Sequence, residues 1–404
     1  MKEVRIGILG NVDSGKTTLC GVLTKQILDN GRGSARDTIM KHKHEKDTGR
    51  TSSVSHYYLR NKDNETNYSF VDLAGHEKYL KTTAYGLNGC CLDYVFLLVG
   101  ANMGVLRMTK EHLGLAVSLK IPIVIVITKI DICPESIFKQ TLNNIKNCLK
   151  IKLVSRNPIL IRNVNDVDKI NDFRNNISDV PIIAISNTSG KNVDVLNYLI
   201  RQNLNFNNKW ENLNDKKKLF VIESCYNVPG VGLVLSGVTT SGIIKLGDRL
   251  KIGPIYNNFH EIIVKSIHNN YRESINELST GNSGCINIKI IDKKVVIKRN
   301  RIKKGKVLIE SNALKNSYRE FVADIKILHH PTTIKINYEP VIHCGTVSQS
   351  AKIFYIENDL LRTGDTSIVK FRFKNRSEYI EKDTQLIFRE GKTKGVGRII
   401  DVIS

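Results

Sequence analysis

The apolar positions divide the chain into two parts with different periodicity. Up to about residue 205, short apolar runs alternate with longer amphipathic segments. Residues 123–127 are apolar at every position, which predicts a strand buried on both faces of a mostly parallel sheet. The expected strands are 4–9, 68–72, 94–99, 121–128 and 181–186. We therefore predict an α/β domain over residues 1–205, with helices covering the sheet.

The second part follows a polar segment, 206–218, that is rich in Asn and Lys and is expected to be a linker. Beyond it, short strands are separated by glycine-containing turns. This pattern is typical of antiparallel β-barrels. We predict two of them, over residues 219–312 and 313–404.

A glycine-rich loop lies between the first expected strand and the first helical pattern. Residues 10–17 read GNVDSGKT and fit G-x-x-x-x-G-K-[ST], whose backbone N–H groups cradle a polyphosphate. Lys16 would neutralise the β- and γ-phosphates, and the Thr17 hydroxyl would bind a magnesium ion. The predicted phosphate-binding residues are Gly10, Asn11, Val12, Asp13, Ser14, Gly15, Lys16, Thr17 and Thr18. The sequence thus predicts a P-loop nucleotide-binding domain.

The second expected strand ends in Asp72-Leu73-Ala74-Gly75-His76. A carboxylate at the carboxyl end of a parallel strand lies at the ligand-binding edge of the sheet, so Asp72 would hold magnesium through water. The Gly75 N–H would meet the γ-phosphate. A histidine after a glycine is more often an ordinary loop residue, but after D-x-x-G we expect His76 to orient the attacking water.

Two further loops are candidates for reading the base. Asp131, in the segment Thr128-Lys129-Ile130-Asp131, would accept from N1–H and the exocyclic amine of guanine, which favours guanine over adenine. Ser186, Asn187 and Thr188 would complete the pocket with backbone N–H groups. A simple helix cap at Ser186 or Ser189 is the alternative.

A long polar stretch, 30–67, separates the P-loop from Asp72. Such stretches inside compact domains are functional or disordered. Thr51, in the segment GRTSS, is expected to bind magnesium and the γ-phosphate, so that the loop orders with GTP and relaxes after hydrolysis. The run 41–44, KHKH, is either a solvated charge run or an RNA contact.

Composition adds a preference for polyanionic partners. Lys and Arg outnumber Asp and Glu by 61 to 39, giving a formal charge of +22. This favours nucleic acid, although an AT-rich genome would also enrich Lys, Asn and Ile. Eight cysteines without a C-x-x-C pair indicate neither a zinc site nor a disulfide framework. No apolar run is long enough to span a bilayer, so we expect a cytoplasmic protein without a membrane partner.

The motifs GNVDSGKTT, DLAGH, TKID and SNTSG together resemble translational GTPases of the elongation factor Tu class. The longer segments RGSARDTIMKHKHEKDTGRTSSV, DLAGHEKYLKTT and GANMGVLRMTKEHLGLA are similar to the GTP-binding protein 1 and 2 family. The resemblance implies a monomer that binds GTP or GDP with magnesium and hydrolyses GTP on the ribosome. It also implies that Thr51 is the switch I threonine, His76 the catalytic histidine and Val12 part of an apolar gate. Asp13 matches an aspartate that helps to hold a monovalent cation in related factors.

Several positions depart from the resembled family. Ala74 stands where most elongation factors have proline, and Arg50 and Ser52 replace apolar neighbours of the switch threonine. Larger relatives carry a long segment before the GTP-binding domain, which we expect to be absent here because Val4 already begins the first strand. Val231 occupies a position that elongation factor Tu gives to arginine, which counts against specific aminoacyl recognition.

One basic pattern lies in the third domain. Lys370, Arg372, Lys374 and Arg376, here called the basic stripe, alternate along one expected strand and so share a face. The stripe would grip a tRNA stem or form a solvated strand edge.

These expectations favour a ribosome-dependent GTPase that binds and delivers aminoacyl-tRNA. A ribosome rescue or messenger-surveillance GTPase without tRNA delivery is one alternative, since it would share every catalytic residue. A regulatory GTPase subunit of a metabolic enzyme, such as a sulfate-activating complex, is another.

Overall fold

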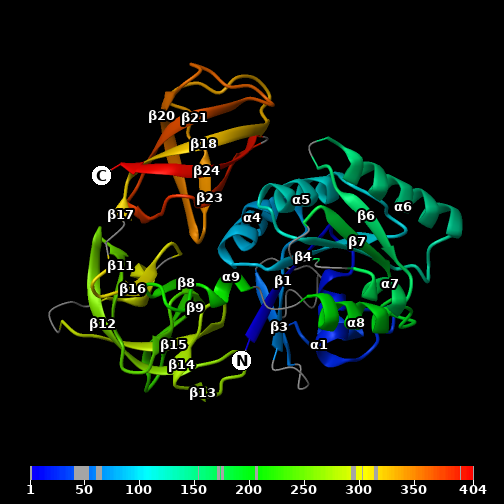
Figure 1. Ribbon diagram of the computed structural model, residues 1–404, viewed down its shortest axis with the longest axis horizontal. Coiled ribbons are helices and arrows are strands. Elements are labelled where there is room, and N and C mark those ends of the chain that lie inside the picture. The colour runs from blue at the N-terminus through cyan, green and yellow to red at the C-terminus, as the bar shows by residue number, and fades with distance from the viewer. Residues whose placement is uncertain are drawn as a thin grey trace. The chain divides into compact units, whose positions relative to one another are not determined.

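The computed structural model describes residues 2–40, 54–60, 66–152, 154–170, 173, 177–204, 208–292, 297–302, 304–313, 317–391 and 393–403. The chain divides into two compact units (Figure 1). The first comprises Met1–Leu87 and Leu92–Asn207, and the second comprises Asn88–Cys91 and Asn208–Ser404. Among the described helices, none has the length and apolarity needed to cross a membrane.

The first unit is built on a seven-stranded sheet in the order β2-β3-β1-β4-β5-β7-β6. Its strands are β1 (Lys2–Gly10), β2 (Ser55–Arg60), β3 (Thr66–Asp72), β4 (Tyr94–Gly100), β5 (Ile123–Thr128), β6 (Asn157–Ile161) and β7 (Asp179–Ala184). Only β2 runs antiparallel to its neighbour. The strands β3, β4 and β5 are buried at every position, as continuous apolar runs predict. The expected mostly parallel α/β domain is confirmed.

Helices cover both faces of this sheet. Figure 1 shows α4 (Leu80–Gly89), α5 (Arg107–Ser118) and α6 (Glu135–Lys150) on one side. On the other side lie α1 (Lys16–Lys25), α7 (Val164–Asp168) and α8 (Val193–Asn203). The shorter elements α2 (Ser34–Asp37) and η1 (Glu77–Tyr79) follow α1 and β3 in the chain. Because β1, β3 and β5 are parallel, Gly10, Asp72 and Thr128 all end strands at the same edge of the sheet.

The main segment of the second unit begins with helix α9 (Asn208–Glu211), which lies in the expected linker; its Trp210 is buried. An antiparallel sheet follows in the order β11-β16-β8-β9-β15-β12-β13, and the additional pairing of β11 with β12 closes it. Its strands are β8 (Leu219–Val228), β9 (Gly232–Ser241), β11 (Arg249–Ile255), β12 (Asn258–His268), β13 (Ser274–Ile275), β15 (Ser283–Ile290) and β16 (Val307–Glu310). The short pair β10 (Ile244–Lys245) and β14 (Glu277–Leu278) and the turn η2 (Arg299–Arg301) complete it.

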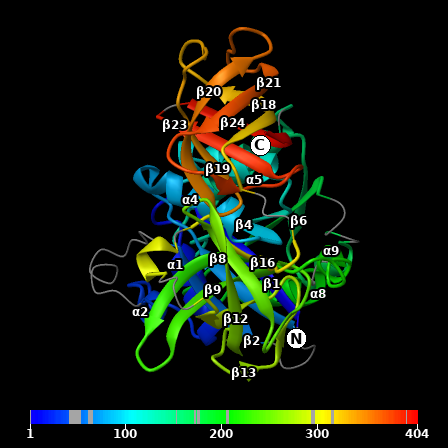
Figure 2. The same cartoon turned by 90° about the vertical axis from the view of Figure 1, so that its left-hand side faces the viewer.

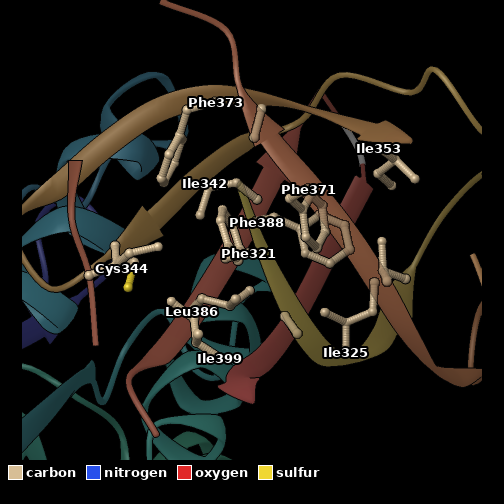
Figure 3. Packing of buried hydrophobic residues seen from close by; sticks show 14 of the residues in the cluster. Phe321, Ile325, Ile342, Cys344, Ile353, Phe371, Phe373, Leu386, Phe388 and Ile399 are labelled. Atoms are coloured by element: carbon tan, nitrogen blue, oxygen red, sulfur yellow. The ribbon is translucent and has the colours of Figure 1, made fainter. Parts of the chain in front are cut away.

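A second barrel follows within the same unit, closed in the order β18-β21-β20-β19-β23-β24 (Figure 2). Its strands are β18 (Glu320–His329), β19 (Val341–Cys344), β20 (Val347–Ile356), β21 (Thr366–Phe373), β23 (Gln385–Glu390) and β24 (Thr393–Ile403), with the pair β17 (Ser317–Tyr318) and β22 (Glu378–Tyr379) beside it. Phe321, Phe371, Phe373 and Phe388 fill its interior (Figure 3). Phe321 stacks on Phe371 with ring centroids 5.3 Å apart. The expected pair of antiparallel barrels is confirmed.

A buried ion pair joins the two barrels. The Lys306 ammonium, just before β16, donates to Oε2 of Glu378 at 2.9 Å, and both side chains are almost completely buried. Oε1 of Glu378 accepts from Arg376 at 2.8 Å and from Gln349 at 3.1 Å. Burial raises the pKa of Glu378, while Lys306 and Arg376 oppose that shift.

The basic stripe is not at a strand edge. Strand β21, which carries its first half, pairs with β18 on one side and β20 on the other. Arg372 donates to Glu320 at 2.7 Å, and Lys374 donates to Glu339 at 2.8 Å. The expectation of a solvated edge is therefore wrong, because the closed barrel pairs both sides of the strand.

Candidate nucleotide-binding site

The P-loop connects β1 to α1 through backbone conformations that favour glycine. Gly10 has φ 150° and Gly15 has φ 84°. A Cβ at Gly10 would lie 2.5 Å from the Ser14 hydroxyl and 2.6 Å from the Leu98 carbonyl oxygen, so no larger residue fits there. Helix α1 begins at Lys16, directly after this turn. Its first backbone N–H groups thus have no partner within the helix and can bind an anion.

The Lys16 ammonium lies over this loop and donates to the Asn11 carbonyl oxygen at 2.7 Å. Burial lowers the pKa of Lys16, whereas the carboxylates of Asp72 and Asp13 oppose that shift. The side chain is therefore desolvated at the wall of a cavity, where the attraction of its charged form for a phosphate is screened little by water.

Two predicted magnesium ligands lie together. The Thr17 hydroxyl donates to Oδ2 of Asp72 at 2.7 Å, and both residues are buried. A hydroxyl and a carboxylate beside a phosphate-binding loop are oxygen donors of the kind that Mg²⁺ prefers. These residues fit a magnesium ion that Thr17 would contact directly and Asp72 through water.

Gly75 approaches this centre more closely than any residue with a side chain could. A Cβ there would lie 2.4 Å from the Lys16 ammonium nitrogen and 2.6 Å from the Gly10 carbonyl oxygen. The absence of a side chain at this position thus allows the loop after β3 to pack closely against the P-loop. The Gly75 backbone therefore lies directly beside the Lys16 ammonium group.

His76 lines the same cavity and is exposed. Its Nδ1 accepts a hydrogen bond from the Lys78 backbone N–H at 3.1 Å and caps η1. Because Nδ1 accepts, the neutral ring carries its proton on Nε2. In this conformation the free edge of the ring is a hydrogen-bond donor.

The segment expected to bind guanine is tied to the P-loop through Thr128. Its hydroxyl donates to the Ser14 carbonyl oxygen at 2.8 Å, and the residue is fully buried. Lys129 follows with φ 62°, and Lys129 and Asp131 line the cavity. Thr128 therefore joins the two loops and does not itself face the cavity.

The alternative interpretation of the loop after β7, a helix cap at Ser186 or Ser189, is wrong, because α8 begins at Val193, after Asn192. The buried Ser186 hydroxyl accepts from the backbone N–H groups of Thr188 at 3.2 Å and Ser189 at 3.0 Å. Ser186 thus shapes the turn, whereas Asn187 and Thr188 reach the cavity.

A cavity of about 410 Å³ gathers most of the predicted residues. The predicted residues that line it are Val12, Asp13, Gly15, Lys16, Thr17, Thr18, Gly75, His76, Lys129, Asp131, Asn187 and Thr188. Six others were not predicted: Asp29, Gly31, Arg32, Gly33, Arg36 and Ile132. Gly10, Asn11, Ser14, Asp72, Thr128 and Ser186 lie behind this wall and position it. Thr51, its neighbours Arg50 and Ser52, and the run 41–44 lie outside the described residues.

Most of the residues that sequence reasoning missed belong to one turn after α1. The Asp29 carboxylate accepts from the backbone N–H groups of Gly31 at 2.9 Å, Gly33 at 3.2 Å and Ala35 at 2.9 Å. The Asp29 backbone N–H donates to the Asn187 carbonyl oxygen at 2.9 Å. An aspartate followed by two glycines is a turn signal, but that signal does not say which loop the turn contacts.

Comparisons with known proteins agree with this geometry. The family described as "Elongation factor Tu GTP binding domain" matches residues 1–206. GTP-binding protein 1 of Xenopus laevis is 42% identical over 425 residues, which cover 99% of this chain and 64% of that protein. GTP-binding protein 2 of Homo sapiens is 37% identical over 424 residues, which cover 99% and 69%. The chain therefore spans slightly less than two thirds of the first relative's length.

Solved structures share the fold at low identity. A bacterial selenocysteine-specific elongation factor, EF-Sec, matches with a TM-score of 0.74 at 20% identity, over 98% of this chain and 58% of that chain. The GTPase-like domain of Ski7 from S. cerevisiae, bound to GTP, matches with a TM-score of 0.77 at 15% identity, over 98% and 97%. With the P-loop, the paired Thr17 and Asp72, and the two barrels in place, the chain belongs to the elongation factor Tu class of translational GTPases, a family of GTP hydrolases.

Proposed function

We propose that the protein binds GTP with magnesium, hydrolyses it on the ribosome and delivers aminoacyl-tRNA. The observation that carries this proposal is the single cavity that Lys16, Thr17, Gly75, His76 and Asp131 line together. These groups suit a polyphosphate at the P-loop and a guanine at Asp131. The two barrels and the formal charge of +22 support a large polyanionic partner.

The reaction would be in-line attack of water on the γ-phosphorus of GTP, with cleavage of its bond to the β,γ-bridging oxygen. Lys16 and the Gly75 N–H would stabilise the charge on the phosphoryl oxygens. A bound magnesium ion, held by Thr17 and through water by Asp72, would share that charge. His76 would orient the water as a hydrogen-bond donor through Nε2, since Nδ1 is engaged by Lys78.

Three finer assignments belong to the same proposal. Thr51 would close the site as a second ligand of magnesium and the γ-phosphate. Asp13, which lines the cavity with φ 59°, would help to hold a monovalent cation. The protein would act as a monomer.

Messenger surveillance or ribosome rescue is the second candidate, and one observation favours it. Val231 lies in the turn between β8 and β9 with 52% of its surface exposed, where a carrier of the elongation factor Tu kind would present arginine. An exposed valine cannot donate a hydrogen bond to a tRNA end.

Filter binding of labelled tRNA separates these candidates. We expect tight binding of aminoacyl-tRNA with a non-hydrolysable GTP analogue, weak binding with GDP, and affinity that falls as salt rises because phosphate contacts release counterions. Equal binding of aminoacylated and deacylated tRNA would favour rescue or surveillance. An absence of tRNA binding by a protein that hydrolyses GTP would favour a regulatory GTPase subunit.

A further inference from the structure

Arg36, a cation on the wall of the nucleotide cavity, is not explained by any of the nucleotide-binding motifs. Arg36 belongs to α2, in the turn that follows α1, and lines the cavity together with Lys16 and Asp131. Its side chain is 30% exposed. A second fixed cation beside a P-loop lysine suggests a contact with the ligand itself.

The turn that carries Arg36 is built rigidly. Its hub is Asp29, which is 8% exposed and whose carboxylate accepts three backbone hydrogen bonds from the turn. Ala35 packs on α1 so closely that a Cβ at Gly21 would lie 2.3 Å from the Ala35 carbonyl oxygen. The turn is therefore anchored to α1 on one side and, through the Asp29 N–H, to the Asn187 carbonyl on the other.

Gly33 makes room for the guanidinium group. Gly33 has φ 95°, and a Cβ there would lie 2.4 Å from Nε and 2.7 Å from Cζ of Arg36. The guanidinium group thus lies directly over the Gly33 backbone. A side chain at position 33 would displace it from the cavity wall.

The donors of Arg36 are mostly unused within the described residues. Its Nε is buried without a hydrogen-bond partner. Its one ion pair is with the adjacent Asp37, at 3.7 Å from Nε, and the Asp37 side chain is 53% exposed. Such a pair contributes little. The guanidinium group is thus held at the cavity with donors available for an oxyanion.

The anchoring of the turn indicates which part of the nucleotide it meets. The turn is bonded to Asn187 in the base-reading loop, whereas Gly75 and His76 line the end of the cavity assigned to the γ-phosphate. We propose that Arg36 donates hydrogen bonds to the α- and β-phosphates and is a second cationic contact that GTP and GDP share. This inference rests on the assignment of the cavity to a guanine nucleotide.

Titration of the full chain with fluorescent GTP and GDP tests the contact. Arg36→Ala should lower the affinity for both nucleotides by about tenfold, because roughly one charge-assisted hydrogen bond is lost. Arg36→Lys keeps the charge but not the planar guanidinium group, so it should lose less affinity than Arg36→Ala. Lys25→Ala is the matched control, because Lys25 is an exposed cation in the last turn of α1 and is not among the residues that line the cavity; its affinity for both nucleotides should fall by less than about threefold.

Lys16→Ala separates failure of this inference from failure of the site assignment. If Lys16→Ala binds as tightly as the unchanged protein, the cavity is not the nucleotide site. If Lys16→Ala binds nucleotide more weakly while Arg36→Ala matches Lys25→Ala, the Arg36 contact is wrong. A loss restricted to GTP would place Arg36 at the γ-phosphate and overturn the proposal. Should Arg36→Ala fail to fold, the Arg36→Lys and Lys25→Ala titrations carry the same comparison.

Discussion

At the scale of single residues, the site depends on side chains that connect loops as much as on those that face the cavity. Thr128 is the clearest case, because its buried hydroxyl donates to the Ser14 carbonyl oxygen at 2.8 Å. Thr128 begins the segment that is expected to read the base, and this hydrogen bond ties that segment to the P-loop. Losing this bond would leave a buried carbonyl unsatisfied and loosen the spacing between phosphate and base.

Replacement of that hydroxyl should weaken the binding of every guanine nucleotide. Thr128→Val keeps the shape of the side chain and removes the donor, so we expect GTP and GDP affinities to fall together by about tenfold, since an unsatisfied buried acceptor costs about 1–3 kcal/mol. Thr128→Ser restores the donor and should bind nearly as the unchanged protein. Equilibrium titration with fluorescent GTP and GDP measures both. Equal affinities for Thr128→Val and the unchanged protein would show that the bond does not organise the site.

The glycines and the phosphate-binding side chains of the site were predictable from the sequence because the spacing of their motifs is a local property. Gly10, Lys16, Thr17 and Gly75 all reach the expected edge of the sheet. The place of Arg36 on the cavity wall was not predictable, because it depends on Asp29 meeting Asn187, far away in sequence. The hydroxyl of Ser186 could equally have faced a ligand, and only the fold shows that it caps its own turn.

At the scale of elements, pairing between distant strands decides what the sequence leaves open. The parallel core strands have continuous apolar runs and were predicted nearly to their ends. Strand β2, at the sheet edge, has an intermediate burial pattern and lies in a polar stretch, so it was not predicted. The alternation of basic residues along strand β21 was predicted correctly, but barrel closure decides that the strand pairs with β18 on one side and β20 on the other.

The buried pair between Lys306 and Glu378 is an element-scale contact whose effect depends on pH. Lys306→Met leaves the Glu378 carboxylate buried with less compensation, so we expect unfolding free energy to fall by about 3 kcal/mol at pH 8. Burial already raises the pKa of Glu378, and Lys306 opposes that shift. Loss of Lys306 should raise this pKa further.

The sign of the pH dependence follows from that shift. A carboxyl with a raised pKa binds more protons in the folded state, so the variant should lose stability as pH rises from about 4.5 through the raised pKa. Thermal unfolding at pH 5 and pH 8 should therefore show the larger deficit at pH 8. Lys374→Met, which breaks an exposed pair with Glu339, is the control and should change little. A deficit that is larger at pH 5 would contradict this account.

At the scale of the whole molecule, the proposed function requires that nucleotide state be read by the ribosome. The described residues contain the phosphate-binding centre and two barrels joined by a buried ion pair. In the described conformation, His76 is engaged in capping η1 and presents Nε2–H. We therefore expect slow hydrolysis by the protein alone, since the histidine must be held against the attacking water for rapid turnover.

The most direct test is steady-state GTP hydrolysis with and without ribosomes, for the unchanged protein and for His76→Ala. The account predicts slow basal turnover, strong stimulation by ribosomes, and loss of that stimulation in His76→Ala while its GTP affinity is retained. Undiminished stimulation in His76→Ala, or no stimulation of the unchanged protein, would contradict a ribosome-activated GTPase that works through His76.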